Sequence, residues 1–256
     1  CDWEGVTCDG GISRAVTALD LAARGLVGTI PNSVGHLSRL KIFRVTGNYL
    51  SGSIPAGVGS LSELIRLDMG DNRIAGSLPA GIEKLSNLVE ISAYLNRLTG
   101  CIPLSVARLA RVALMDLSHN AISGSLSAAV GGMPSLRALL LSGNRVSGSV
   151  PASIGSLTNL ISLFLNNNRI DGEIPTAIGQ SCSLIHVDLS DNCIVGSIPL
   201  SLGSLTNIGY LSLQHNALNG SIPRSVSALS RLEQLHLQSN SLTGSLPAAL
   251  GDLSSL

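Results

Sequence analysis

Asparagine recurs every 24 residues along almost the whole chain. No insertion or deletion interrupts this spacing, and only Arg24 replaces asparagine in the column. The column consists of Asn48, Asn72, Asn96, Asn120, Asn144, Asn168, Asn192, Asn216 and Asn240. A glycine follows each position of the column four residues later, and a proline follows three residues further on in nine of ten cases. A fixed period of this length indicates stacked copies of one small structural unit.

The repeated unit reads L-x-x-L-x-L-x-x-N-x-L-x-G-x-I-P, and its two halves predict different structures. In the first half, Leu67 and Met69 are two residues apart, which places them on one face of a short strand. Arg66 and Asp68 then point to the opposite face. Strands that recur every 24 residues stack in parallel, and the second half returns behind them. Its apolar residues are expected to fill the space there: Ile74, Leu78, Ile82 and Leu85.

The asparagine of each unit lies where the chain turns out of the strand. Its amide can satisfy the backbone donors and acceptors that a turn leaves free, so the column predicts a buried hydrogen-bond ladder. The glycine allows a backbone conformation that other residues avoid, or close approach of the next turn, and the proline suits a ridge outside a central strand ladder. These residues are expected to be structural and not catalytic.

The unit resembles the leucine-rich repeat, and the G-x-I-P continuation resembles its plant-type form. This resemblance implies an α/β repeat solenoid, a superhelix or horseshoe with a parallel β-sheet on the concave face. Short 3-10 helical turns are expected on the convex face. The resemblance divides the chain into part of an amino-terminal cap (residues 1–15), ten repeats (16–255) and the start of an eleventh at Leu256.

The opening stretch CDWEGVTC resembles the amino-terminal cap of plant receptor kinases and receptor-like proteins of this family. The resemblance implies a disulfide between Cys1 and Cys8, which indicates an oxidising extracellular compartment. A solenoid needs a cover for its first core layer, and Trp3 is the expected lid. A helical part usually precedes this motif, and the last repeat stops without a cap. The chain is therefore expected to be a piece of a longer protein.

Three further cysteines are too far apart to pair, since Cys101 lies three to four repeats from the others, and Cys182 and Cys193 flank opposite ends of one strand. We expect three free thiols. Cys182 is expected to be buried, because it neighbours Ser181, which replaces the last leucine of the repeat. The sequence Asn219-Gly220-Ser221 is a glycosylation sequon, and it is also the local repeat sequence.

Composition excludes several classes of partner. The formal net charge is zero, only 12% of residues are charged, and no basic run interleaves with aromatic residues. These features argue against nucleic acid and anionic membrane surfaces as partners. No apolar run reaches the roughly 18 residues of a membrane helix, so membrane attachment is expected only through a segment outside this chain. No cofactor is expected.

The exposed strand positions of a solenoid carry its binding information, because packing fixes the core positions. The central exposed position of each strand gives Asp20, Arg44, Asp68, Ser92, Asp116, Leu140, Phe164, Asp188, Ser212 and His236. The second half of this column, together with the position two residues earlier, predicts a ligand surface of Leu140, Phe164, His186, Asp188, Tyr210, Ser212 and His236. Apolar and aromatic groups ringed by polar ones suit a peptide or small ligand. Single exposed Leu or Phe residues are also common on any protein surface.

Catalysis is not expected at this surface. A nucleophilic triad needs histidine between the carboxylate and the serine, whereas the order Asp188, Ser212, His236 places serine in the middle. No glycine-rich turn offers an oxyanion hole. A metal site is not expected either, since His186, His215 and His236 lie at different heights along their strands.

The leading hypothesis is that the chain forms part of the extracellular domain of a plant-type receptor kinase or receptor-like protein. By family resemblance, it would bind an extracellular peptide, small molecule or microbial product on its concave or lateral surface and recruit a co-receptor ectodomain. The alternative is a secreted inhibitor that resembles the polygalacturonase inhibitors. A scaffold protein without a defined ligand is a third reading. A column of serines before the I-P step suggests ice binding, but such serines are ordinary in plant-type repeats.

Overall fold

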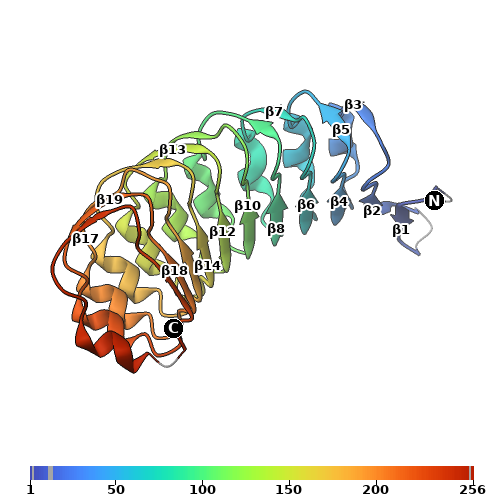
Figure 1. The fold of residues 1–256 in the computed structure, drawn as a ribbon. Coiled ribbons are helices and arrows are strands. Elements are labelled where there is room, and N and C mark those ends of the chain that lie inside the picture. The colour runs from blue at the N-terminus through green and yellow to red at the C-terminus, as the bar shows by residue number, and fades with distance from the viewer. Residues whose placement is uncertain (2, 11–13, 254) are drawn as a thin grey trace.

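The computed structural model describes residues 1, 3–10, 14–253 and 255–256. These residues form a curved solenoid with the two ends of the chain at opposite ends of the curve (Figure 1). Each turn of the solenoid contributes one strand to a long sheet, and short helices return behind it. Within the described residues, no helix is both long and apolar enough to cross a membrane.

The main sheet contains eleven strands in the described part of the chain, arranged in sequence order. They are β1 (Val6–Cys8), β2 (Val16–Asp20), β4 (Ile42–Arg44), β6 (Arg66–Asp68), β8 (Glu90–Ser92), β10 (Leu114–Asp116), β12 (Ala138–Leu140), β14 (Ser162–Phe164), β16 (His186–Asp188), β18 (Tyr210–Ser212) and β20 (Gln234–His236). Strand β1 pairs antiparallel with β2, and every later pair is parallel. The parallel sheet predicted from the repeat is confirmed.

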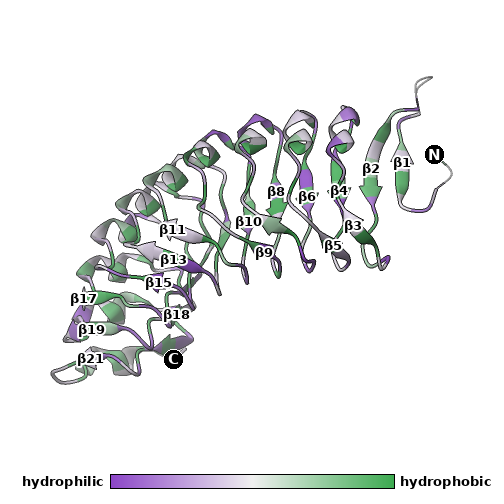
Figure 2. Ribbon diagram, turned by 90° about the horizontal axis from the view of Figure 1, so that it is seen from above, coloured by the Kyte–Doolittle hydropathy of each residue, from purple (hydrophilic) through white to green (hydrophobic). Residues whose placement is uncertain are grey.

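The parallel pairs keep a register of one repeat, as Leu67 opposite Ile91 and Met115 opposite Leu139 illustrate. Equivalent residues therefore stack in columns. The apolar columns form one continuous core, in which Leu67 and Met69 are fully buried. Apolar residues recur in each turn of the solenoid (Figure 2). As predicted, the return path of that repeat is buried too, at Ile74, Leu78, Ile82 and Leu85.

Shorter strands follow the asparagine column and form small parallel sheets along the other edge of the solenoid. They are β3 (Val27–Thr29), β5 (Tyr49–Ser51), β7 (Ala75–Gly76), β9 (Arg97–Leu98), β11 (Ser123–Ser125), β13 (Arg145–Gly148), β15 (Arg169–Ile170), β17 (Val195–Ser197), β19 (Ala217–Gly220) and β21 (Ser241–Leu242). Gly148 of this edge has φ +71°, a left-handed conformation that favours glycine. The predicted role of the glycine column is thus confirmed.

The return path behind the sheet is a series of five-residue 3-10 helices, each preceded by the proline of the repeat or by Ser127. In the described residues they are η1 (Asn32–His36), η2 (Ala56–Ser60), η3 (Ala80–Lys84), η4 (Leu104–Arg108), η5 (Ala128–Gly132), η6 (Ala152–Ser156), η7 (Thr176–Gln180), η8 (Leu200–Ser204), η9 (Arg224–Ala228) and η10 (Ala248–Asp252). These short helices complete the predicted solenoid.

The asparagine column forms the predicted hydrogen-bond ladder. The Asn72 Oδ1 atom accepts from the backbone N–H of Leu50 at 2.9 Å, and its Nδ2 atom donates to the carbonyls of Val45, Met69 and Gly70. The asparagines from Asn48 to Asn240 share this pattern of contacts with their own repeat and the preceding one. The ladder satisfies backbone groups that the turns leave unpaired and ties neighbouring repeats together.

The predicted role of Trp3 as a lid is wrong. Its side chain is 82% exposed, and the first core layer opens into a pocket bordered by Leu19, Leu26 and Leu37. The antiparallel strand β1 instead extends the main sheet beside β2. Because β1 pairs with the edge of the sheet, it continues the hydrogen bonds of the sheet but does not cover the core behind it. Trp3 therefore stays in solvent.

Candidate functional site

The seven residues of the predicted ligand surface lie on five neighbouring strands, β12 to β20. Parallel pairing sets five of them in one row, which runs Leu140, Phe164, Asp188, Ser212 and His236. The other two form a second row, in which His186 pairs with Tyr210. The register of the sheet thus brings the seven residues together.

Phe164 lies on the opposite side of its strand from the core. Its neighbours Leu163 and Leu165 are fully buried, whereas Phe164 is half-buried. Its ring stacks on the ring of His186 on the next strand, with the centroids 6.4 Å apart and an angle of 23° between the planes. The contact runs diagonally, since Phe164 is opposite Asp188 in the strand register. An outward phenylalanine in this position is available to a ligand.

A second aromatic and imidazole pair lies on β18 and β20. The ring centroids of Tyr210 and His236 are 5.7 Å apart, with a tilt of 54° between the planes. This contact is also diagonal, because Tyr210 is opposite Gln234 in the register. A diagonal contact between an aromatic ring and an imidazole therefore occurs twice in four strands, with opposite diagonals and with only the first pair stacked. Such pairs combine apolar area with hydrogen-bonding edges, which suits recognition of a partly polar ligand.

Asp188 lies between the two ring pairs and ends its strand. Its Oδ1 atom accepts from the backbone N–H of Ser190 at 3.0 Å and from the Ser190 hydroxyl at 2.6 Å. Asp116 makes the same two contacts with Ser118 in an earlier repeat. The carboxylate of Asp188 is thus held in one position beside Phe164.

Ser212 was expected to be exposed, and this prediction is wrong. Its side chain is 0% exposed, and its hydroxyl has no hydrogen-bond partner. It lies in the register between Asp188 and His236, whose larger side chains flank it on both sides. Ser92 is buried in the same way between Asp68 and Asp116. A small residue between long neighbours on a concave face is covered by them.

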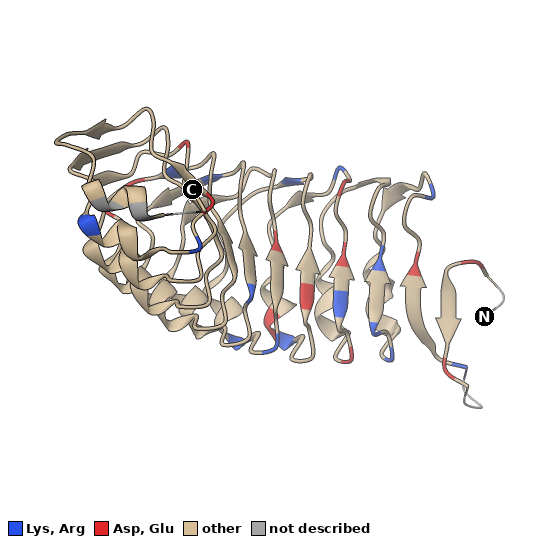
Figure 3. Ribbon diagram, turned by 60° about the horizontal axis from the view of Figure 1, so that its bottom comes forward, with Lys and Arg blue, Asp and Glu red and all other residues tan. Residues whose placement is uncertain are grey.

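The first half of the face is charged. The Arg44 guanidinium lies between two carboxylates, 3.4 Å from Asp20 and 3.4 Å from Asp68. Figure 3 shows these charges side by side at the ends of β2, β4 and β6. Asp68 is only 9% exposed, so its pairing with Arg44 offsets part of the cost of burying its charge. This half offers paired charges in place of an apolar centre.

Tyr94 follows strand β8 and lies beside this charged row. Burial raises the pKa of its phenol above the ordinary value, and the carboxylates of Asp68, Asp71 and Asp116 add to the shift. The repeat pattern alone did not point to this residue. One sequence feature could have pointed to Tyr94: the equivalent position one repeat earlier is Gly70, where a Cβ atom would overlap the Tyr94 ring.

The structure places Asp188, Ser212 and His236 side by side on β16, β18 and β20. The hydroxyl that a nucleophile would need belongs to the buried Ser212, and the His236 ring packs on Tyr210. In the part of the chain that the structure describes, no cluster of three or more His, Cys, Asp or Glu side chains is suited to a metal ion.

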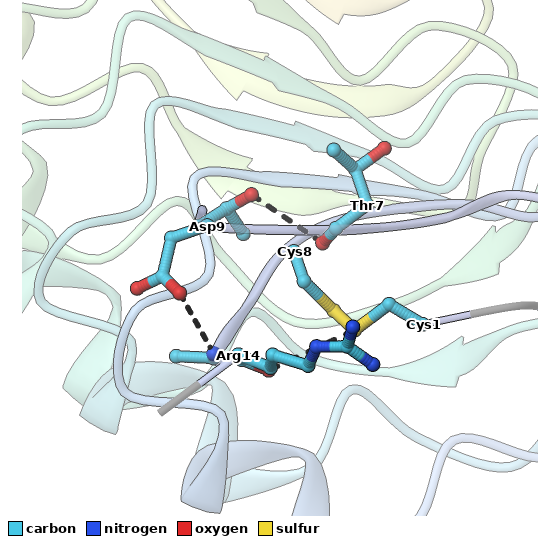
Figure 4. The surroundings of a disulfide bond; sticks show 7 residues. Cys1, Thr7, Cys8, Asp9 and Arg14 are labelled. Carbon is cyan, nitrogen blue, oxygen red and sulfur yellow. Dashed lines mark hydrogen bonds between the residues drawn. A yellow bond between two sulfur atoms is a disulfide. The ribbon is translucent and has the colours of Figure 1, made fainter. Parts of the chain in front are cut away.

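The Cys1–Cys8 disulfide is present, with 6.0 Å between the two Cα atoms (Figure 4). Asp9 supports this end: its backbone N–H donates to the Ala15 carbonyl at 2.9 Å, and its carboxylate accepts from the Ala15 N–H at 3.0 Å. These contacts fasten the disulfide-linked strand to the start of β2. The sequon residue Asn219 is exposed on β19, and its glycosylation stays a prediction.

Cys101, Cys182 and Cys193 are free, as predicted, and all three are exposed. The expectation that Cys182 is buried is therefore wrong. Ser181 itself occupies the core column, with 0% of its surface exposed, and its hydroxyl donates to the Ile154 carbonyl at 2.8 Å. The buried space is filled by Ser181, which leaves Cys182 at the following surface position.

Comparison with known families identifies the repeat. The family model described as Leucine Rich Repeat matches residues 135–157, 159–181, 183–205 and 231–253. The receptor protein kinase WSS1 of Oryza sativa subsp. japonica is 47% identical over 51 residues, which are 20% of this chain and 6% of that protein. The chain therefore spans a small part of this curated relative.

Solved structures extend the likeness to nearly the whole chain. The Arabidopsis receptor kinase HAESA, in complex with the peptide hormone IDA and the co-receptor SERK1, matches 90% of this chain and 39% of that chain, with 32% identity and a TM-score of 0.87. A plant ice-binding protein matches 97% of this chain and 80% of that chain, with 25% identity and a TM-score of 0.79. The fold is thus a leucine-rich repeat solenoid like that of plant receptor ectodomains.

Proposed function

Since the chain is a leucine-rich repeat solenoid that resembles the ectodomains of plant receptor kinases, we propose that it recognises an extracellular ligand as part of such a receptor. The ligand class is a peptide or a small molecule with both apolar and polar groups. A co-receptor ectodomain would join the complex, as SERK1 does in the HAESA structure. The site is the concave surface of Leu140, Phe164, His186, Asp188, Tyr210 and His236. Ser212 lies beneath it as a buried floor residue.

One observation carries this proposal. Two aromatic and imidazole pairs, Phe164 with His186 and Tyr210 with His236, flank the fixed carboxylate of Asp188 on one face of a rigid sheet. Aromatic anchors supply much of the binding energy in protein interfaces, and a preformed surface avoids part of the entropy cost of ordering the binder. The charged half of the face has paired ions instead and is a weaker candidate.

The disulfide and the relatives support a location on the extracellular side of the plasma membrane or in the cell wall. Disulfides persist in oxidising compartments and are rare in the cytosol. Any membrane anchor would belong to a part of the protein outside this chain.

The proposal is tested by ligand selection on the immobilised protein. A displayed library of random peptides and a small-molecule fraction of plant extracellular fluid are each passed over the wild-type chain and over Phe164→Ala. We expect ligands that the wild type retains and Phe164→Ala loses. Tyr49→Ala is the matched control, because Tyr49 is an exposed aromatic residue on the other edge. Retention that is the same on all three proteins would contradict the proposed site.

A further inference from the structure

Two pockets of the same construction lie along the edge of the main sheet where its strands begin. The first, of about 390 Å³, is lined by Lys41, Glu63, Ile65, Asn87, Val89 and Arg111. The second, of about 260 Å³, is lined by Arg137, Asn159, Ile161, Ser183, Ile185 and Asn207. Each residue of the first pocket has its counterpart four repeats later in the second. We call this surface the amino edge, and the ligand surface proposed above does not include it.

Both pockets have an apolar floor of branched residues. Ile65 is 42% exposed, Val89 40% and Ile185 38%, although each directly follows a buried core residue. The backbone holds this row in place, since the N–H groups of Ile65 and Arg66 both donate to the Lys41 carbonyl at 2.8 and 3.0 Å. The same forked contact recurs in the second pocket, where Ile185 and His186 donate to the Ile161 carbonyl. The edge therefore presents fixed apolar sites to solvent.

A ladder of polar side chains borders the pockets. The Asn87 amide donates to the Ser62 carbonyl at 2.9 Å, and the Arg111 guanidinium donates to Asn87 Oδ1 at 2.8 Å. In the second pocket, Asn159 and Asn207 donate in the same manner to carbonyls of the preceding repeats, each at 2.9 Å. These contacts fix the shape of the pockets before any partner arrives.

The charge of the amino edge is positive in a chain whose formal net charge is zero. Neither Lys41 nor Arg137 takes part in an ion pair among the described residues. Glu63 is the one carboxylate in either lining, and it lies 3.9 Å from Arg39. No Asp or Glu lies at residues 110–113, 134–137, 158–161, 182–185 and 206–209, which precede or begin the later strands. Beside the first pocket, Glu90 is paired with Arg66 at 2.6 Å. A partner that complements this edge is acidic.

The spacing of the pockets sets the geometry of that partner. Four repeats at about 4.8 Å per strand separate the pockets by about 19 Å, which an extended peptide covers in about six residues. We propose that the amino edge binds an extended acidic peptide segment, two apolar side chains of which lie six residues apart and enter the two pockets. Carboxylates of the segment lie near Lys41 and Arg137. The partner need not be the ligand of the concave face.

The test uses fluorescein-labelled peptides of twelve residues, composed of glutamate and serine with two leucines. The leucines are separated by four to eight positions, and binding is measured by fluorescence anisotropy. We expect the tightest binding at a separation of six. Replacing either leucine by serine, or the glutamates by lysine, weakens binding by about tenfold or more.

Variants of the protein locate the contact. Arg137→Ser and Ile161→Ser are each expected to weaken binding of the best peptide by about tenfold. The first removes a positive charge, and the second removes part of the apolar floor of the second pocket. Arg97→Ser removes an exposed arginine from the other edge and is expected to leave binding unchanged, as is Phe164→Ala on the concave face. Circular dichroism confirms that each variant is folded.

Three results would overturn the proposal. The first is that none of the peptides binds. The second is binding that depends on glutamate content but not on leucine spacing, which would indicate general attraction of polyanions. The third is binding that Phe164→Ala abolishes and Arg137→Ser does not, which would move the peptide to the concave face. The last result would leave the proposed ligand surface intact.

Discussion

The rings of Phe164 and His186 lie nearly parallel across strands β14 and β16, with their centroids 6.4 Å apart. The strand register places Phe164 opposite Asp188, so the stack joins diagonal neighbours on one face of the sheet. The phenylalanine ring is therefore held by a neighbouring side chain while part of its surface stays open to solvent. A ligand that covers this ring would displace water from an already ordered surface.

Replacing this ring tests its role in binding. Phe164→Ala is expected to weaken binding of the ligand retained by the wild type by about 1 to 3 kcal/mol, the range of an aromatic anchor in an interface. The melting temperature should change little, because Leu163 and Leu165 supply the core packing of this strand. Isothermal calorimetry and thermal unfolding measure the two effects. Unchanged affinity with a lowered melting temperature would assign Phe164 a purely structural role.

Each buried asparagine of the ladder is expected to contribute to stability. Asn144→Ala removes the Oδ1 acceptor of the Ile122 N–H at 3.0 Å and the Nδ2 donor to the carbonyls of Leu117 and Leu141, all three contacts buried. Leaving such groups unpaired should lower the free energy of unfolding by about 2 to 3 kcal/mol. Denaturant unfolding monitored by circular dichroism measures the loss.

A matched control distinguishes the loss of a buried ladder asparagine from the loss of an exposed asparagine amide. Asn159→Ala also removes an asparagine amide, but Asn159 makes one contact, to the Pro134 carbonyl, at an exposed position. Its loss should cost less than about 1 kcal/mol. Equal costs for the two substitutions would contradict a special role of the buried column.

The repeat period was enough to predict the parallel sheet, the buried leucine columns, the asparagine ladder and the outward side of Phe164. These features follow from periodicity alone, since one register applies to every copy of the unit. Leu67 and Met69 are buried and Asn72 bridges two repeats because their places in the unit leave no alternative.

Features that depend on neighbouring side chains could not be predicted in this way. The period places Ser212 between Asp188 and His236 in the outward column, but it does not show that these larger side chains cover it. The absence of a leucine at Ser181 suggested burial of Cys182, whereas Ser181 fills the site itself through a hydrogen bond. The cap motif likewise indicated a disulfide correctly but not the path that leaves Trp3 exposed.

The thiols provide a direct chemical check of these positions. Because Cys101, Cys182 and Cys193 are exposed and free, we expect Ellman's reagent to modify all three in the folded protein. Cys1 and Cys8 should react only after reduction, since they form a disulfide. Mass spectrometry of the modified peptides identifies each site. Protection of Cys182 until the protein unfolds would restore the original prediction that it is buried.

Tyr94 is expected to make stability fall at alkaline pH. Burial, reinforced by the carboxylates of Asp68, Asp71 and Asp116, raises the pKa of its phenol in the folded state. The folded chain then keeps the proton that the unfolded chain releases, so stability is fully present below the ordinary tyrosine pKa of about 10 and declines as the pH rises above it. Urea unfolding between pH 8 and pH 11 should show this decline.

Tyr94→Phe should reduce the slope of stability against pH and remove the tyrosinate absorbance that develops above the ordinary range. Asp188→Asn, a carboxylate change farther along the face, serves as the control and should leave the slope unchanged. A slope that Tyr94→Phe does not alter would show that other groups control the alkaline loss of stability.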